Sequence, residues 1–248
     1  MRVDVYFGAS SMTSADVHGR VVVVIDVLRA STTIAAALAN GARSVIPFES
    51  AEEAITRSKS FARSDYKLAG ERRNLRIPGF DLGNSPREFT REQVEGKSIL
   101  LTTTNGTAAL VAVQGAREVV VGGYANFTPV LALVRAAARG GNDVVILAAG
   151  SDRHFSLEDA TCAGRFVRMA AQRIPGAVLN DAAVTALLLQ RRYGNDLSRL
   201  FADASHGRAL VEAGFDEDLA VCGALDLYPV VPVYQDRQIT KLGPERER

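Results

Sequence analysis

The 248 residues are 47% apolar, enough for one large or two small hydrophobic cores, and acidic and basic residues are mixed along the chain to a net charge of +1. The chain has no block of basic residues that would indicate nucleic-acid binding. No stretch approaches the roughly 18 apolar residues that a membrane span requires. The cysteines, Cys162 and Cys222, form neither a disulfide framework nor a zinc motif, and the N-terminus lacks a signal-peptide core. We therefore expect a cytoplasmic protein that binds neither nucleic acid nor membrane.

Strands and helices alternate through the first 160 residues. Residues 2–7 alternate as a short strand does, and 21–25 are a run of β-branched residues, which is typical of a strand buried on both faces. A helix follows at about 31–38, and Asn40-Gly41 suits its end. A strand at 44–48, a helix at 50–63 and a strand at 66–69 complete this first series.

The stretch VVVVIDVLRASTT, residues 21–33, organises this part of the chain. It predicts that Asp26 lies at the carboxyl end of a central strand, with Ser31 or Thr32 capping the helix that begins there. In open α/β sheets, ligands bind at this position, and free backbone N–H groups favour an anion. The alternative is that Asp26 is only a turn residue between a core strand and a capped helix.

The same order recurs in the second series: strands at 97–103, 118–121 and 143–148, with helices at 108–113, 127–139 and 160–173. We expect a single α/β domain over 1–248. It would have a largely parallel or mixed sheet, helices on both faces, and two similar βαβαβ-like halves, about 21–75 and 97–160. A chance resemblance between the halves is the alternative. If they are equivalent, the strand-end loops 26–33, 70–74, 102–107 and 150–159 converge on one cleft.

The remainder, about 160–240, is predicted to be mostly helical, including an amphipathic helix at 181–192. Pro229 and Pro232 limit the run from 228 to 234 to an edge strand or an extended cover.

Five acidic residues occupy predicted loops or strand ends: Asp26, Glu71, Asp81, Glu158 and Asp159. Carboxylates gathered at the ends of parallel strands indicate a site for a hard cation such as Mg²⁺. The alternative for Glu158 and Asp159 is that they simply open the next helix, where acidic residues are favourable.

Two turns, 29–33 and 102–107, are candidates for anion binding, because Asn105-Gly106-Thr107 exposes backbone N–H groups at a helix start. Neither turn is a Walker A loop or a dinucleotide fingerprint, so no nucleotide cofactor is indicated. Arg29, Arg72, Arg73 and Arg153 could add guanidinium groups for phosphate or sulfonate oxygens. His206 is open to two interpretations, a helix cap or a substrate contact.

Together these segments resemble the 2-phosphosulfolactate phosphatase family. The resemblance covers about residues 2–240 and is carried in order by VVVVIDVLRASTTIAAAL, LAGERRN, GFDLGNSP, TTTNGT and SLEDATCAG, followed by ASHGRALVEAGFDEDLAVC. One departure is GERRNLRIPGF, where the family resemblance leads us to expect a small residue, often glycine, near Arg73.

The resemblance implies magnesium-dependent hydrolysis of 2-phospho-3-sulfolactate to 3-sulfolactate and phosphate, a step toward coenzyme M. We expect Asp26, Arg29, Glu71 and Asp159 to be catalytic, and Asp26, Glu158 and Asp159 to hold Mg²⁺. Substrate contacts are expected from Ser31, Thr32, Asp81, Asn84, Thr104, Asn105, Gly106, Thr107 and His206. The partner would be a small anionic phosphoester, and the sequence is compatible with a homodimer.

Two other functions stay open at this point. A haloacid-dehalogenase-like phosphatase would use Asp26 as nucleophile, but it requires a second acidic residue two positions later, where Leu28 stands. A non-catalytic anion-binding protein could share the shape of the site, but it would release no phosphate.

Overall fold

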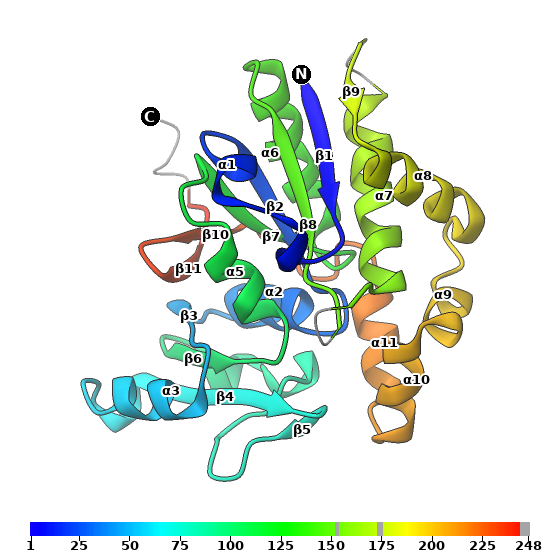
Figure 1. Ribbon diagram of the computed structural model, residues 1–248. Helices are drawn as coiled ribbons and strands as arrows, with labels where there is room; N and C mark the ends of the chain where they lie inside the picture. Colours follow the sequence, from blue (N-terminus) through cyan, green and yellow to red (C-terminus); the bar gives the residue numbers. More distant parts are fainter. Residues whose placement is uncertain (152–153, 173–175, 244–248) are drawn as a thin grey trace.

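The strands form one mixed sheet of eleven strands, in a computed structural model that describes residues 1–151, 154–172 and 176–243 (Figure 1). The strands are β1 (Arg2–Tyr6), β2 (Val21–Ile25), β3 (Ser44–Pro47), β4 (Tyr66–Arg72), β5 (Leu75–Arg76), β6 (Ser98–Thr102), β7 (Glu118–Gly122), β8 (Val144–Ala148), β9 (Val178–Leu179), β10 (Pro232–Gln235) and β11 (Gln238–Lys241). Their order across the sheet is β5-β4-β6-β3-β11-β10-β7-β2-β8-β1-β9. The predicted α/β class with a mixed sheet is confirmed.

The helices lie on both faces of this sheet and at one end of it. They are α1 (Ser14–Val17), α2 (Ala30–Ala39), α3 (Ala51–Ser58), α4 (Arg91–Val94), α5 (Gly106–Ala112), α6 (Phe127–Arg139), α7 (Leu157–Ala171), α8 (Asp181–Tyr193), α9 (Leu197–Asp203), α10 (Ser205–Glu212) and α11 (Asp216–Gly223). None of the helices in the described part of the chain has the length and apolar character needed to cross a membrane.

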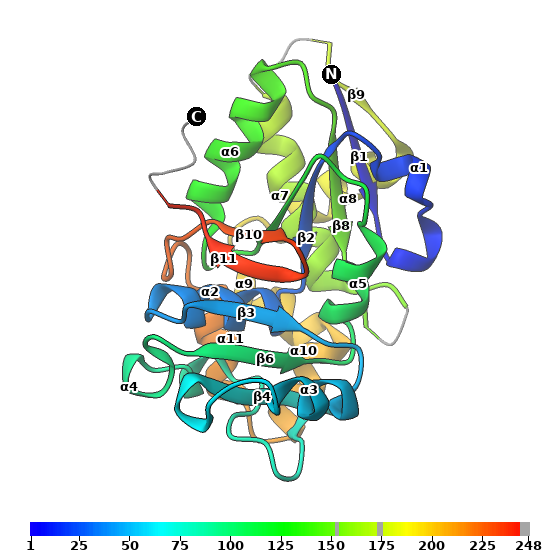
Figure 2. The same cartoon turned by 90° about the vertical axis from the view of Figure 1, so that its left-hand side faces the viewer.

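A hairpin, β10–β11, joins two parallel parts of the sheet (Figure 2). β10 pairs antiparallel with β7, through Val233 and Tyr234, and β11 pairs antiparallel with β3, where Ile239 lies opposite Val45. The expectation of an edge strand or a cover at 228–234 is therefore wrong, because β10 is internal. Pro232 fits there because it is the first residue of the strand, where its missing N–H interrupts no run of ladder bonds.

The parallel parts do not follow the order of the chain. β2 lies between β7 and β8, whereas β6 lies between β3 and β4. The first strand of each expected half is thus hydrogen-bonded to the strands of the other half. This exchange places the carboxyl ends of β2 and β6 on either side of the junction between the two parts.

β2 is buried on both faces, as its run of β-branched residues predicts. All five of its residues are at most 2% exposed. Val23 and Ile25 belong to the core that includes Phe166 of α7, whereas Val22 and Val24 belong to the core that includes Ile34 of α2. Because side chains alternate along a strand, these two cores hold β2 and the residue after it, Asp26, from opposite sides.

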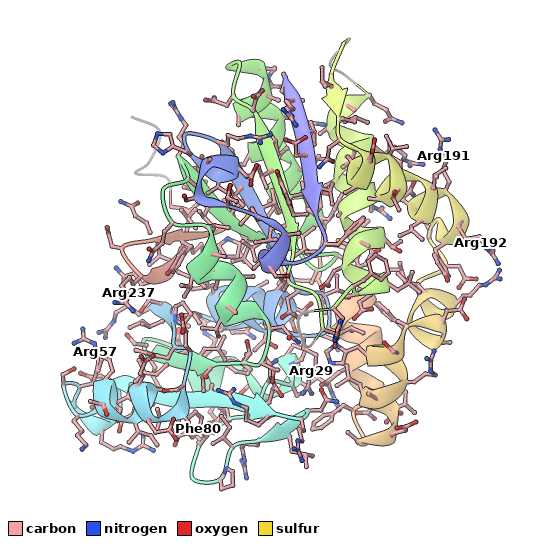
Figure 3. The ribbon with its side chains drawn as sticks, in the orientation of Figure 1. Arg29, Arg57, Phe80, Arg191, Arg192 and Arg237 are labelled. Atoms are coloured by element: carbon pink, nitrogen blue, oxygen red, sulfur yellow. The ribbon has the colours of Figure 1, made fainter. Side chains whose placement is uncertain are left out.

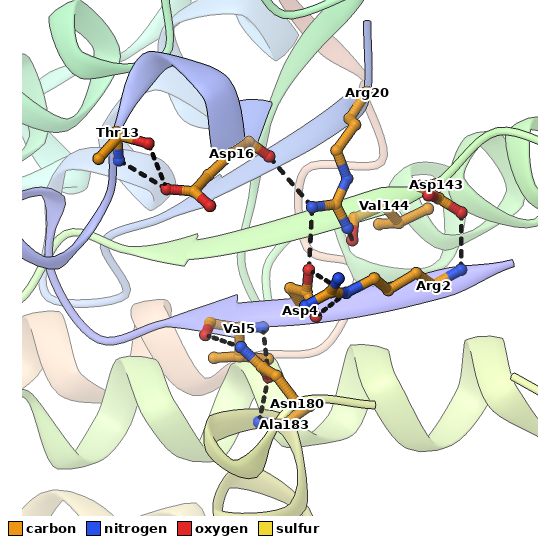
Figure 4. A network of polar contacts seen from close by, with 10 residues as sticks. All are labelled: Arg2, Asp4, Val5, Thr13, Asp16, Arg20, Asp143, Val144, Asn180 and Ala183. Carbon is orange, nitrogen blue, oxygen red and sulfur yellow. Dashed lines mark hydrogen bonds and ion pairs between the residues drawn. The ribbon is translucent and has the colours of Figure 1, made fainter. Parts of the chain in front are cut away.

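A buried polar network fastens β1 far from the junction (Figure 4). Asp4 is 1% exposed and forms ion pairs with Arg20 at 2.9 Å and Arg2 at 2.8 Å. On the next residue, the side chain of Asn180 accepts a hydrogen bond from the Val5 N–H and donates one to its carbonyl oxygen. Asn180 thereby substitutes for a neighbouring strand and ties β1 to the start of α8.

Candidate active site

A cavity of about 530 Å³ opens at the carboxyl ends of β2, β4, β6 and β8. Its lining includes residues from each of the four strand-end loops, which confirms that these loops converge on one cleft. The lining residues are Asp26, Leu28, Arg29, Glu71, Arg72, Arg73, Asn74, Asn84, Thr103, Thr104, Asn105, Ser151, Ser205, His206 and Ala209.

Asp26 follows β2 directly and lies at the start of α2. One of its carboxylate oxygens accepts a hydrogen bond from the Ala30 N–H at 3.2 Å, and its own N–H donates to Ser31 Oγ. The expected cap by Ser31 or Thr32 is therefore wrong: no side chain of the helix caps it, and the Asp26 carboxylate binds the first helical N–H instead. The Ala30 and Ser31 N–H groups at the start of α2 are thus already hydrogen-bonded to Asp26.

The pKa of Asp26 is raised to about 6. Burial is the main cause, and the charges of Glu71 and Glu158 raise the pKa further, whereas His206 and the Ala30 N–H lower it. A carboxyl group with a pKa near 6 is still mostly ionised at neutral pH, but its charged form is less stable in the protein than it would be in water.

Glu71, at the end of β4, joins two of the loops that line the cavity. One carboxylate oxygen accepts hydrogen bonds from the N–H and the hydroxyl of Thr104, both at 2.9 Å, and the other accepts the N–H of Asn74 at 3.0 Å. Both oxygens are therefore used to hold the β4–β5 turn against the turn after β6.

Arg29 reaches the cavity from the junction between the sheet and the C-terminal helices (Figure 3). Its guanidinium donates to Asp218 of α11 at 2.8 Å and to the backbone oxygen of Asn74 at 2.9 Å, and it lies 4.3 Å from the centre of the Phe215 ring. Asp218 also accepts a hydrogen bond from Ser85 at 2.6 Å. Arg29 is only 2% exposed, so these contacts fix its charge in place.

His206, on the first turn of α10, faces two oxygen acceptors. Its Nε2 lies 3.1 Å from Asn74 Oδ1, and its Nδ1 lies 3.6 Å from a carboxylate oxygen of Glu158. Burial lowers the pKa of His206, but the hydrogen bond and charge of Glu158 and the charge of Asp26 raise it more, so that the net shift is upward. The charged form of His206 is therefore more favourable than that of a free histidine.

Glu158 and Asp159 open α7 behind the cavity and are each 2% exposed. Asp159 accepts hydrogen bonds from the N–H groups of Val27 at 2.8 Å and Gly150 at 3.3 Å, so it holds two strand-end loops together. Its pKa is raised well above the ordinary value by burial and by the charges of Glu158 and Asp26. Neither residue is among those that line the cavity.

The expected ligand set of Asp26, Glu158 and Asp159 is not assembled. Within the residues that the structure describes, no group of three acidic, histidine or cysteine side chains is arranged to hold a metal ion. Both carboxylate oxygens of Asp159 accept hydrogen bonds from backbone N–H groups. Of the three acidic residues, only Asp26 lines the cavity.

Asp81 is the expected site residue that lies apart from the others. It forms ion pairs with Arg63 and Lys67 and accepts the N–H of Leu68 at 2.9 Å, so it fixes the loop after β5 to β4. Polar loop character alone could not distinguish this structural role from a role at the cavity. Arg153, considered above as an anion-binding residue, lies outside the described residues.

Four small residues expected to contact substrate, Ser31, Thr32, Gly106 and Thr107, are not among the residues that line the cavity. Thr32 donates to the Val27 carbonyl, Thr107 accepts the Thr103 N–H, and Ser31 binds Asp26 as described. Gly106 instead provides space: a Cβ atom there would lie 3.0 Å from Asp26 Oδ2. Their contacts support the loops that carry the lining residues.

Asn84, Arg72 and Arg73 supply polar groups of the lining. Asn84 is 5% exposed, and its side-chain oxygen has no hydrogen-bond partner among the described residues. Arg72 donates to Thr102 and to two backbone oxygens, while Arg73 extends from a left-handed turn position, with φ 53°, and is exposed. Buried polar atoms are normally paired, so the oxygen of Asn84 is available to a water molecule or a ligand.

Comparisons with known proteins agree on one family. Residues 8–237 match the family model of 2-phosphosulpholactate phosphatase. A protein of Symbiobacterium thermophilum is 42% identical over 92% of this chain and 96% of its own length. Proteins of Clostridium beijerinckii (36% identical over 97% of this chain and 99% of its own length) and Caldanaerobacter subterraneus subsp. tengcongensis (39% over 94% and 95%) are similar too. All three are named "Probable 2-phosphosulfolactate phosphatase".

Proposed function

The chain belongs to the 2-phosphosulfolactate phosphatase family, and on that premise we propose that it hydrolyses the phosphate ester of 2-phospho-3-sulfolactate, or of a closely related small phosphorylated acid. The products would be 3-sulfolactate and phosphate. The observation that best supports this is the charge of the cavity, in which the buried carboxylate of Asp26 and the guanidinium groups of Arg29, Arg72 and Arg73 line the same space.

The residues fit a bound Mg²⁺. Five buried carboxylates, those of Asp26, Glu71, Glu158, Asp159 and Asp218, lie at or next to the cavity. Among the nearby charged side chains that the structure describes, the buried Arg29 and the partly buried His206 balance them. Burial is the main cause of the raised pKa of Asp26, and the charges of Glu71 and Glu158 add to it. A divalent cation would relieve that repulsion.

Asp26 would hold the cation, with the free oxygen of Asn84 as a second candidate ligand. Mg²⁺ typically uses one or two carboxylates together with substrate phosphate oxygens and water, so a full protein cage is not required. Glu158 and Asp159 would act from behind, by adding negative charge and by fixing the loops that carry Asp26. When bound, the cation would withdraw charge from the transferring phosphoryl group.

A substrate with both a phosphate and a sulfonate requires two anion sites. Arg29 is rigidly held between Asp218 and the Asn74 backbone, which suits it to the phosphoryl oxygens beside Asp26. Arg72 and Arg73 line the same cavity from the β4–β5 turn and are placed to receive the distal acid groups. Guanidinium groups suit both anions because they offer paired N–H donors.

Attack by water is the mechanism we propose for the phosphoryl transfer. Asp26, ionised at neutral pH, would orient the cation and the water, while the charged forms of Arg29 and His206 would stabilise the charge that develops on the phosphoryl group and leaving oxygen. Covalent attack by Asp26 is the second possibility. It lacks the usual support, because the position of a second acidic residue is occupied by Leu28, which is 2% exposed.

The test is a phosphatase screen of the purified protein with Mg²⁺ across small phosphorylated acids. We expect 2-phospho-3-sulfolactate to give the highest kcat/KM, with phosphorylated hydroxy acids that lack the sulfonate below it. A protein that binds these compounds tightly but releases no phosphate would be the anion-binding protein instead. The configuration at phosphorus, followed with an isotopically chiral phosphate ester, separates the two mechanisms: a single in-line attack by water inverts it, whereas two successive displacements through a phosphorylated Asp26 retain it.

A further inference from the structure

Asn74 contacts three other residues of the cavity lining, although no sequence pattern identified it as a site residue. Its N–H donates to Glu71, its carbonyl oxygen accepts from Arg29, and its side-chain oxygen lies 3.1 Å from His206 Nε2. These partners come from β4, from the loop before α2 and from α10. One residue thus connects three cavity-lining side chains that are distant in sequence.

The backbone conformation makes this possible. Arg73 and Asn74 have φ values of 53° and 68° and form the two central positions of the turn between β4 and β5. Turns of this kind require left-handed residues, and asparagine tolerates this conformation better than other residues except glycine. In this conformation, the N–H of Asn74 faces Glu71, while its carbonyl and side chain face Arg29 and His206.

The contact between the Asn74 side chain and His206 differs from the other two, because it depends on the side chain and not on the backbone of the turn. We infer that Asn74 is a positioning residue for the proposed phosphatase reaction, acting through His206 by holding its ring between Asn74 and Glu158. The inference rests on the proposed function only for its effect on turnover. The orientation of the His206 ring can be measured without any substrate.

Asn74→Gly is the discriminating variant. Glycine adopts the left-handed conformation at no cost, so the backbone bonds to Glu71 and Arg29 remain and only the contact with His206 is lost. Asn74→Asp retains both the turn preference and a side-chain oxygen for His206. A matched control is Asp236→Gly, because Asp236 has φ 52° in the turn between β10 and β11, outside the lining of the cavity.

NMR of the imidazole rings gives the first readout, because the chain has only three histidines. The signals that disappear in His206→Gln are those of His206. We expect Asn74→Gly to shift the His206 ring signals and leave those of His18 and His154 unchanged, while Asp236→Gly shifts none of the three. Unchanged His206 signals in Asn74→Gly would overturn the inference, whatever the protein catalyses.

Turnover gives the second readout. We expect Asn74→Gly to lower kcat/KM about tenfold, mainly through kcat. Asn74→Asp should recover kcat to within about threefold of wild type, with a higher KM because the added charge repels the substrate. In a double-mutant cycle, Asn74→Gly should cost little more in a His206→Ala background. If the two effects multiply instead, Asn74 does not act through His206. A wild-type protein that releases no phosphate would refute the proposed function but would leave the NMR comparison valid.

Discussion

The Arg29 guanidinium and the Asp218 carboxylate lie 2.8 Å apart, although 189 residues separate them in the chain, and both are at most 2% exposed. This ion pair ties α11 to the start of α2 and holds a positive charge at the cavity. Loss of either side chain would leave the other as a buried, unpaired charge, which destabilises the fold. Because Arg29 lines the cavity, the same loss would also disturb the site.

We predict that Asp218→Ala lowers the free energy of unfolding by about 3–5 kcal/mol and also lowers kcat, because it leaves the buried guanidinium unpaired. Urea denaturation and phosphate release measure the two effects. Asp4→Ala is the matched control, because Asp4 is equally buried and ion-paired but belongs to β1, away from the cavity. It should lose stability and keep kcat. If Asp218→Ala does not fold, Asp218→Asn retains a hydrogen-bond acceptor, and we expect it to fold with reduced kcat. Wild-type kcat in a folded Asp218 variant would contradict the prediction.

We predict that Asp26→Asn abolishes turnover and, without metal, stabilises the fold at neutral pH. The pKa of Asp26 rises from 3.8 to about 6 on folding, so between these values the folded state binds more protons than the unfolded state. Stability of the wild-type metal-free protein therefore falls as pH rises through this window and stays lower above it. The uncharged amide introduced by Asp26→Asn avoids this loss, which is on the order of 1–3 kcal/mol.

Urea denaturation in chelator at about pH 5 and pH 7.5 tests this sign, since the advantage of Asp26→Asn should be larger at the higher pH. A variant that is less stable than wild type at pH 7.5 would contradict the predicted sign. A variant that retains turnover at saturating Mg²⁺ would leave Asp26 as a turn residue only.

Mg²⁺, rather than Zn²⁺, should support turnover, because the candidate ligands are oxygen atoms and the chain has no zinc-type Cys/His spacing. We expect chelation to stop phosphate release and added Mg²⁺ to restore it. Mg²⁺ should also raise the melting temperature of the wild type but not that of Asp26→Asn. Full activity after exhaustive chelation would remove the metal from the mechanism.

Gly106→Ala should lower kcat at least tenfold, since a Cβ atom at this position would lie 2.8 Å from the Ala30 Cβ and 3.0 Å from Asp26 Oδ2. Either α5 or the Asp26 carboxylate must move to accept it. Gly8→Ala is the control, because its Cβ would meet only Ser10 Oγ, at 3.9 Å. Equal kcat in both variants would show that the contact between α5 and Asp26 is not required for turnover.

The sequence was sufficient to predict the parts of the site that depend on local pattern. The β-branched run before Asp26 marks a doubly buried strand, and the carboxyl ends of parallel strands share one edge. Six residues were therefore expected to line one cleft: Asp26, Arg29, Glu71, Asn105, Thr107 and Asp159. The first four do so, whereas Thr107 and Asp159 are not among the lining residues. The capping of α2 by Asp26 was missed, because Ser31 and Thr32 carry the stronger local signal for a cap.

Contacts between distant segments could not be read from the sequence. Asp218 lies in GFDEDLAVC, where three acidic residues open a helix, and nothing in the local pattern indicates which of them would reach Arg29. Asn74 was hidden for a similar reason, since a left-handed turn residue usually serves only its own turn. The prolines around β10 suggested an edge because the pairing of β11 with β3 spans almost 200 residues and leaves no local trace.

The hairpin β10–β11 also affects how the protein is made. Residues 232–241 leave the ribosome after every other strand of the sheet has been synthesised. Until then, β7 and β3 each expose an unpaired edge of backbone N–H and C=O groups, next to strands that are already apolar on both faces. Exposed edges of this kind pair readily with other chains. We therefore expect the nascent protein to be prone to aggregation until the hairpin has formed, and molecular chaperones that bind exposed strand edges should increase the yield of folded protein.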